Sequence, residues 1–302
     1  MNIEDVADYA CRCGEGPLWH PAERRVYWVD IPAGRLFRLD PETRAHEAVY
    51  QDRPIGGFTL QADGALLCFR DRGNVVVWRD GRVARTVIET VPELAATRFN
   101  DVCADPEGRV FCGTLSAPGL SGRLYRLDPD GRLTRLGDGY GTPNGMGFSP
   151  DGRTFYFNDS GTDRPVTYAF DYTRATGALS NRRVFRDAHS NGDPGMPDGL
   201  AVDAAGGVWT ARWDGSALLR FRPDGTLDET IPFPVRKVSS LCFAGEDLRD
   251  IYATSAGGDR RDTDGAEAGT LFRLQGAAVP GLARHVSRIS RAAESGSSRH
   301  VP

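Results

Sequence analysis

The chain repeats a unit of forty-odd residues six times, and this repeat limits the possible folds more than any other feature. Equivalent positions fall at residues 15, 57, 100, 144, 198 and 239, in steps of 42, 43, 44, 54 and 41 residues. Each unit has the pattern of an apolar strand, a turn rich in Asp and Gly, and further strands separated by short loops. Four strands in each such repeat are typical of a β-propeller blade. The sequence therefore predicts an all-β, six-bladed β-propeller with four antiparallel strands per blade.

Such a ring needs a strand that joins its two ends, because an open ring leaves bare strand edges. Residues 6–11 or residues 283–289 could supply this strand. The longest step contains an insertion at residues 187–196, rich in Gly, Asn, Ser and Pro, which we expect to form a loop over one face. We assign residues 1–290 to a single propeller domain. The Ser- and Arg-rich residues 291–302 are predicted to be a disordered C-terminal tail.

Composition argues against two classes of partner. A net charge of −4 with scattered arginines gives no basic patch of the kind that nucleic acid requires. No apolar run approaches the roughly 20 residues of a membrane span, and the N-terminus lacks a secretory pattern. We expect a cytoplasmic protein that binds neither nucleic acid nor a membrane and is a monomer or a weak homo-oligomer.

The six cysteines favour the same compartment. None forms a C-x-x-C pair, and four lie in apolar strand patterns, as buried reduced thiols do. A disulfide between Cys103 and Cys112 stays open as a second interpretation.

Polar residues begin four of the six units. They are Glu15, Asn100, Asn144 and Asp198. The first strand of a blade lines the central channel, so these side chains are expected to meet at one end of it. Two carboxylates and two amides there would form an all-oxygen site, which suits a hard divalent cation such as Ca²⁺, Mg²⁺ or Mn²⁺ and would offset the carboxylate repulsion. The alternative is that these residues only make hydrogen bonds in turns.

On these residues the chain resembles the regucalcin/gluconolactonase (senescence marker protein) family of six-bladed propeller lactonases. The resemblance runs from about residue 11 to residue 289 and keeps the order and spacing of the motifs. The matching motifs are Gly14-Glu15-Gly16-Pro17-Leu18-Trp19, Arg98-Phe99-Asn100-Asp101 with Gly113-Thr114, Pro143-Asn144-Gly145, Pro197-Asp198-Gly199, and Cys242-Phe243 through Tyr252-Ala253-Thr254.

The resemblance implies one divalent metal ion held by Glu15, Asn144 and Asp198, and a substrate bound by Arg98 and Asn100. The sequence does not choose among Ca²⁺, Mg²⁺, Mn²⁺, Zn²⁺ and Fe²⁺. The implied activity is hydrolysis of a lactone, with a sugar (aldono-) lactone as the first candidate. The cation would polarise the ring carbonyl, and Asp198 would be the catalytic base. A hydroxide held by the cation is the alternative base.

One departure concerns the sugar. Many sugar-lactonase relatives follow Gly-Thr with methionine and an acidic residue that contacts sugar hydroxyls, whereas residues 113–118 here read Gly-Thr-Leu-Ser-Ala-Pro. A less polar lactone, or another ester such as an organophosphate, therefore stays open. A non-catalytic Ca²⁺-binding propeller also stays open, because propellers host many functions. Asp159 and Trp213, which follow strands in units four and five, are further candidates to line a pocket.

Two other hydrolytic sites have no sequence support. The five histidines stand in no H-x-H or H-E-x-x-H arrangement, which argues against a zinc–histidine site. The sequence also lacks a G-x-S-x-G motif, which argues against a serine hydrolase.

Overall fold

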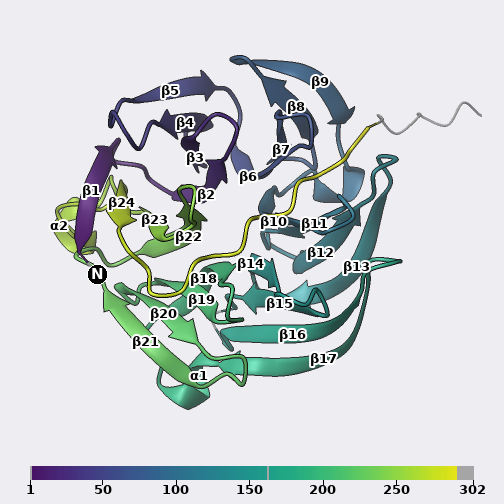
Figure 1. Cartoon of the computed structure of the whole chain (residues 1–302). Helices are drawn as coiled ribbons and strands as arrows, with labels where there is room; N and C mark the ends of the chain where they lie inside the picture. The colour runs from purple at the N-terminus through teal and green to yellow at the C-terminus, as the bar shows by residue number, and fades with distance from the viewer. Residues whose placement is uncertain (1, 162, 291–302) are drawn as a thin grey trace, which may run out of the picture.

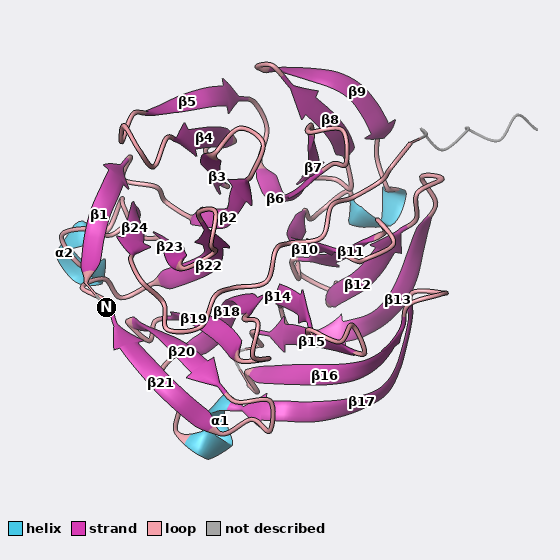
Figure 2. Cartoon of the chain, viewed as in Figure 1, coloured by secondary structure: helices cyan, strands magenta, loops and turns pink. Residues whose placement is uncertain are grey.

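The computed structural model describes residues 2–161 and 163–290, which form a ring of six four-stranded antiparallel sheets around a central channel (Figure 1). The predicted six-bladed, all-β propeller is thus confirmed. Strands make up nearly all of the regular structure, and the helices are single short turns at the rim (Figure 2). The predicted tail, residues 291–302, lies outside the described residues.

The first three blades follow the chain order from the inner strand to the outer one. Blade one contains β2 (Gly14–His20), β3 (Arg25–Asp30), β4 (Arg35–Leu39) and β5 (His46–Gln51). Blade two contains β6 (Ile55–Leu60), β7 (Leu66–Arg70), β8 (Val75–Arg79) and β9 (Arg82–Ile88). The 3₁₀ helix η1 (Pro92–Leu94) leads to blade three, which contains β10 (Phe99–Ala104), β11 (Val110–Thr114), β12 (Gly122–Leu127) and β13 (Leu133–Tyr140).

The next three blades keep this order, except that the last one borrows its outer strand. Blade four contains β14 (Pro143–Phe148), β15 (Thr154–Asp159), β16 (Val166–Thr173) and β17 (Ala178–Asp187). Helix α1 (Ala188–Asn191) precedes blade five, which contains β18 (Met196–Val202), β19 (Val208–Trp213), β20 (Ala217–Phe221) and β21 (Leu227–Pro232). Blade six contains β22 (Val238–Ala244), β23 (Asp250–Ser255), β24 (Thr270–Leu274) and β1 (Ile3–Asp8), with helix α2 (Arg261–Asp264) between β23 and β24.

The N-terminal strand closes the ring. Strand β1 pairs antiparallel with β24, with Ile3 opposite Leu274 and Asp8 opposite Thr270. The first of the two predicted closing segments is therefore the better one, although the strand begins and ends three residues earlier than predicted. The insertion at residues 187–196 contains the short helix α1 as well as a loop, because the Asp187 carboxylate caps that helix by accepting from Ser190 N.

The second predicted closing segment has a different role. Residues 281–290, here called the C-terminal strap, cross one mouth of the channel (Figure 1). Their backbone N–H groups bond to several blades: Leu282 donates to Val202, Ser287 to Leu60, and Arg288 to Gly108. The strap thus ties together blades that are far apart in sequence.

The inner strands pack tightly around the channel. Strands β2, β6, β10, β14, β18 and β22 contact one another in a closed circle. Glycine allows the closest approach: a Cβ added at Gly145 on β14 would overlap the backbone nitrogen of Leu200 on β18. Between blades, buried aromatic rings fill the core, as where Phe111 of blade three meets Phe148 and Phe155 of blade four.

Two further findings concern the helices and the cysteines. Among the described residues, no helix is both long and apolar enough to cross a membrane. All six cysteines are free, and the Cys103–Cys112 disulfide is not formed. The register explains this result: Cys103 lies opposite Phe111, the residue before Cys112, so the two thiols lie on opposite faces of the sheet.

Candidate active site

The polar residues that begin four inner strands meet at one mouth of the channel. Glu15, Asn100, Asn144 and Asp198 are each only 4% to 6% exposed. Asn100 Nδ2 donates a hydrogen bond to Asn144 Oδ1, and Glu15 lies close enough to Asp198 for its negative charge to raise the pKa of Asp198. Residues separated by more than 180 positions in the sequence are thus brought to one place by the ring.

An irregularity near the start of each inner strand exposes these side chains to the channel. The register shifts on β10, β14 and β18 span Asn100, Asn144 and Asp198. On β2, Glu15 still pairs with Val29, and the shift lies directly after it, before Leu18. Strands β6 and β22 shift after Ile55 and Val238. A bulge of this kind re-aims a side chain and frees backbone groups from the ladder. The repeat therefore places an irregularity near the start of every inner strand, close to the polar residues of the site.

The Asp198 carboxylate is buried without a hydrogen-bond donor. No donor in residues 2–161 or 163–290 is bonded to its side-chain oxygens; only its backbone oxygen accepts, from Asn158 Nδ2 at 2.7 Å. Burial raises the pKa of Asp198 well above its usual value, and the negative charge of Glu15 raises it further. Such a group needs a proton or a cation to be stable in this position.

Glu15, on β2 of blade one, has a similar environment at the channel mouth. Its Oε2 accepts a hydrogen bond from Gly16 N at 2.8 Å. Burial raises the pKa of Glu15 well above its usual value, the Asp101 carboxylate adds to the rise, and the Gly16 bond opposes it only in part. Glu15 and Asp198 together therefore form a centre of negative potential.

Asp101 is a functional candidate that the sequence analysis did not assign. Burial raises the pKa of its carboxyl to about 6, against the lowering effect of Arg284 and Arg98. In a regular strand Asp101 would lie on the face opposite Asn100, but the register shift on β10 lies between Phe99 and Val102 and removes that alternation. Its position directly after Asn100 in a bulged strand is the signal that could have identified it.

A chain of hydrogen bonds fixes the amides of the site. Arg98 Nη1 donates to Asn100 Oδ1 at 2.6 Å, and Asn100 donates in turn to Asn144 Oδ1. Asn144 Nδ2 donates to Ser160 Oγ at 2.6 Å, and the Ser160 hydroxyl donates to the Pro197 carbonyl. Ser160, which the sequence analysis also missed, therefore holds the amide nitrogen of Asn144 away from the carboxylates. The amide oxygen of Asn100 is occupied by Arg98.

The oxygen atoms gathered at this mouth fit a hard divalent cation as ligands. Within the described part of the chain, no three or more His, Cys, Asp or Glu side chains are grouped to hold a metal. The predicted set is of another kind, because it combines two carboxylates, Glu15 and Asp198, with the amide oxygen of Asn144. Oxygen ligands of this type suit Ca²⁺ or Mg²⁺, and the donor-free Asp198 carboxylate is the group that a cation would stabilise most.

The two predicted pocket-lining residues make structural contacts. The Asp159 carboxylate accepts hydrogen bonds from Gly141 N at 2.9 Å and Thr142 N at 3.0 Å, and so supports the loop before β14. Trp213 packs under Lys237, whose Nζ lies 5.7 Å from the ring centroid. Both residues lie at the strand ends nearest the site. The contacts described above give each of them a structural role in the blades.

The sequence and the fold are similar to those of several known proteins. The family model described as SMP-30/Gluconolactonase/LRE-like region matches residues 13–257. Pentonolactonase XacC of Haloferax volcanii is 46% identical over 288 residues, which cover 92% of this chain and 96% of that protein. Human regucalcin is 34% identical over 300 residues, which cover 94% of this chain and 97% of the relative.

A solved structure extends the similarity to three dimensions. A calcium-binding protein, regucalcin, from Agrobacterium tumefaciens matches the fold with a TM-score of 0.84 and 26% sequence identity. The match covers 94% of this chain and 96% of that one. Sequence and structure thus agree over nearly the whole ring.

Proposed function

Because the chain belongs to the SMP-30/gluconolactonase/LRE-like family, we propose that it is a metal-dependent lactonase that opens an aldonolactone, in particular a pentonolactone, to its aldonic acid. The observation that carries this proposal is the pair of buried carboxylates, Glu15 and Asp198, at one mouth of the channel. The choice of a five-carbon sugar lactone is supported by the 46% identity to a pentonolactonase.

Glu15, Asn144 and Asp198 would hold the metal ion. When bound there, a divalent cation supplies Lewis-acid polarisation of the lactone carbonyl. Calcium is our first candidate, because one similar structure is described as a calcium-binding protein. Mg²⁺, Mn²⁺, Zn²⁺ and Fe²⁺ are the alternatives in the experiment below.

Asp198 is the proposed general base. Its side-chain oxygens have no hydrogen-bond donor among the described residues, so one of them is free to take the proton of the attacking water. Arg98 is half-buried and bonds to Asn100 and the Phe99 carbonyl through Nη1 alone. Its other N–H groups are available to orient the ring carbonyl or a sugar hydroxyl.

The loop after Gly113-Thr114 offers no carboxylate for sugar hydroxyls. Leu115 stands where many relatives have the methionine, and Ser116 stands where they have the acidic residue. The Leu115 carbonyl accepts from Thr97 Oγ1 at 2.7 Å, and Leu115 N donates to the Arg98 carbonyl at 3.1 Å. Hydroxyl recognition is therefore assigned to Arg98, which Asn100 orients by accepting a hydrogen bond from its Nη1. This assignment predicts tolerance toward lactones that differ in hydroxyl configuration away from the carbonyl.

The proposal is tested by following proton release from a panel of lactones. The metal-stripped protein is expected to be inactive, and restoring one divalent cation is expected to restore turnover, with pentonolactones ahead of simple aliphatic lactones. Paraoxon, an organophosphate ester, belongs in the same panel. If the protein binds Ca²⁺ tightly but turns over no lactone, the non-catalytic calcium-binding alternative replaces the proposal.

Six free cysteines support a cytoplasmic location as part of the proposal. Cys11, Cys68, Cys112 and Cys242 are buried, and burial raises the pKa of the Cys11 thiol to about 12. Thiols of this kind are inert structural groups in a reducing compartment.

The free energy of unfolding of the metal-free protein is expected to fall as the pH rises. The metal-loaded protein should lose less stability over the same interval. Folding raises the pKa of Asp198, Glu15 and Asp101, so the folded state holds more protons than the unfolded chain above about pH 4. For Asp101 alone, the rise in pKa from 3.8 to about 6 corresponds to about 3 kcal/mol of folding free energy, which is lost as the pH rises through this interval. The gain in melting temperature on adding Ca²⁺ should therefore increase from pH 4 to about pH 7. If the gain in melting temperature stays constant from pH 4 to pH 7, repulsion between the ionised carboxylates does not destabilise the metal-free protein.

Ser160→Ala is expected to weaken metal binding about tenfold while leaving the fold intact. The substitution removes the acceptor of Asn144 Nδ2 and frees the amide to rotate its nitrogen toward the carboxylates. Calorimetric titration with Ca²⁺ measures the effect. Ser149→Ala, which changes a hydroxyl at the other end of blade four, is the matched control and should bind the metal as the wild type does. Equal affinities for both variants would show that Ser160 does not orient Asn144.

A further inference from the structure

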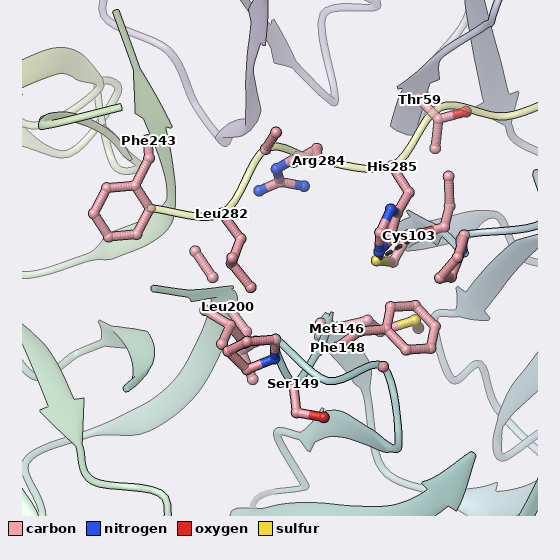
Figure 3. A pocket seen from close by; sticks show the side chains of 18 of the residues that line it. Thr59, Cys103, Met146, Phe148, Ser149, Leu200, Phe243, Leu282, Arg284 and His285 are labelled. Carbon is pink, nitrogen blue, oxygen red and sulfur yellow. Dashed lines mark hydrogen bonds between the residues drawn. The ribbon is translucent and has the colours of Figure 1, made fainter. Parts of the chain in front are cut away.

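The mouth of the channel opposite the candidate active site contains a cavity of about 350 Å³ beneath the C-terminal strap (Figure 3). The same inner strands line both places, at opposite ends. Strand β18 begins near Asp198 and ends at the cavity with Leu200 and Val202, and β14 carries Asn144 at its start and Phe148 at the cavity. The cavity is therefore distinct from the carboxylate site.

The cavity wall is mainly apolar. Figure 3 shows Leu200, Met146, Phe148 and Phe243 around it, with Leu282 of the strap on the near side. A cavity of this size lies at the lower end of the range for small-molecule sites. A polyhydroxylated sugar acid would leave its hydroxyls without partners against such a wall, at a cost in free energy for each. The sugar substrate of the other mouth is therefore a poor ligand here.

One cation at the cavity has no carboxylate in direct contact. Arg284, on the strap, donates from Nη2 to the Leu241 carbonyl at 3.0 Å and forms no salt bridge within the described residues, although its charge acts at longer range on the Asp101 carboxylate. Of the other charged lining groups, Arg174 pairs with Glu107 at 2.6 Å, whereas Asp151 keeps its negative charge and accepts a hydrogen bond from Ser149 Oγ at 2.6 Å. Arg284 can therefore pair with an incoming anion.

Of the two strap residues with basic side chains at the cavity, Arg284 carries a charge and His285 does not. Its ring also lines the cavity (Figure 3). Burial lowers the pKa of His285 below its usual value, so the ring is neutral near pH 7. A neutral imidazole adds hydrogen-bonding capacity to the cavity without a second positive charge.

We propose that this cavity is a second ligand site, which binds a compact carboxylate with an apolar body, such as an aryl-substituted acetate. The carboxylate pairs with the Arg284 guanidinium, which presents parallel N–H groups suited to it. The apolar body packs against Leu200, Phe148 and Met146. The residues that line this site differ from those assigned to the proposed lactone hydrolysis, although the charge of Arg284 lowers the pKa of Asp101.

Methyl resonances of methionine test the proposal directly. The chain has three methionines, of which Met146 lines the cavity and Met196 lies two residues before Asp198 at the other mouth. Phenylacetate added to ¹³C-methyl-methionine protein is expected to shift the Met146 signal saturably and to leave Met196 unchanged. Phenylacetamide, the neutral analogue, should bind about tenfold more weakly or worse, because it lacks the charge-assisted pair.

The Arg284→Gln variant should bind phenylacetate at least tenfold more weakly than the wild type does, because its side chain cannot form the charge-assisted pair. Arg288→Gln is the matched control, because Arg288 lies on the same strap but does not line the cavity, and it should bind phenylacetate as the wild type does. The proposal is overturned if Met146 does not respond, if acid and amide bind the wild type equally, or if both arginine variants lose binding alike. The comparison of acid with amide needs only the wild-type protein, so it holds even if a variant is poorly folded.

Discussion

Asp198→Asn is expected to lower kcat/KM for lactone hydrolysis about 10³-fold. The amide keeps the size of the side chain, and the hydrogen bond from Asn158 to the Asp198 backbone carbonyl is untouched. The amide cannot take a proton from water, however, and it removes one of the two negative charges of the proposed metal site. Because the change lowers turnover more than substrate binding, most of the loss should appear in kcat, measured at saturating Ca²⁺ in the proton-release assay.

Asp171→Asn is the matched control for this experiment. Asp171 lies on the exposed part of β16 and pairs with Arg183 at 2.7 Å, so its loss should change kcat by less than twofold. Calorimetry of both variants separates weaker metal binding from a lost base. If Asp198→Asn with bound metal keeps more than a tenth of the wild-type kcat, Asp198 is not the base.

Gly145→Ala is expected to destabilise the protein by about 3 kcal/mol or more, or to prevent folding. The added methyl group would lie 2.5 Å from the Asp198 carbonyl oxygen and would overlap the backbone of Leu200. Backbone atoms of a central strand cannot move aside as a flexible side chain can, so β14 and β18 would have to separate. The midpoint of urea unfolding measures the loss, and the displacement of Asp198 should abolish activity in any folded fraction.

Gly161→Ala provides the comparison for that substitution. Its Cβ would meet its nearest neighbour, Gly141 Cα, at 3.5 Å, which is ordinary van der Waals contact. We expect its free energy of unfolding, obtained from the urea midpoint, to lie within about 0.5 kcal/mol of the wild-type value. Similar midpoints for the two variants would mean that the inner strands can separate more easily than their packing suggests.

The blades could be predicted from the sequence because the signal is periodic and local. Alternating apolar residues and Asp-Gly turns recur in every unit, so each unit supports the assignment of the others. Ring closure was harder, because residues 6–11 and residues 283–289 both have a pattern compatible with an outer strand. The choice depends on pairing with β24, a contact between the two ends of the chain that no local pattern records.

The leading residues of the inner strands were identifiable for the same reason as the blades. Glu15 and Asn144 occupy equivalent positions in a repeat, and the structure places them at one mouth. Asp101 and Ser160 were missed because neither occupies a repeated position. Asp101 reaches the channel region through an irregular register on β10, and Ser160 reaches Asn144 from a loop that follows β15. Both depend on three-dimensional detail that periodicity does not contain.

The pairing of β1 with β24 has a consequence for the synthesis of the protein. Ile3 meets Leu274, so the last sheet cannot be completed until almost the whole chain has left the ribosome. Until then β1 has no partner, and the earlier blades wait as an open arc with bare strand edges at both ends. Contacts of such long sequence separation also form slowly. The nascent chain therefore passes through a late interval in which its two free edges can pair with other molecules, and chaperone binding during translation should be concentrated there.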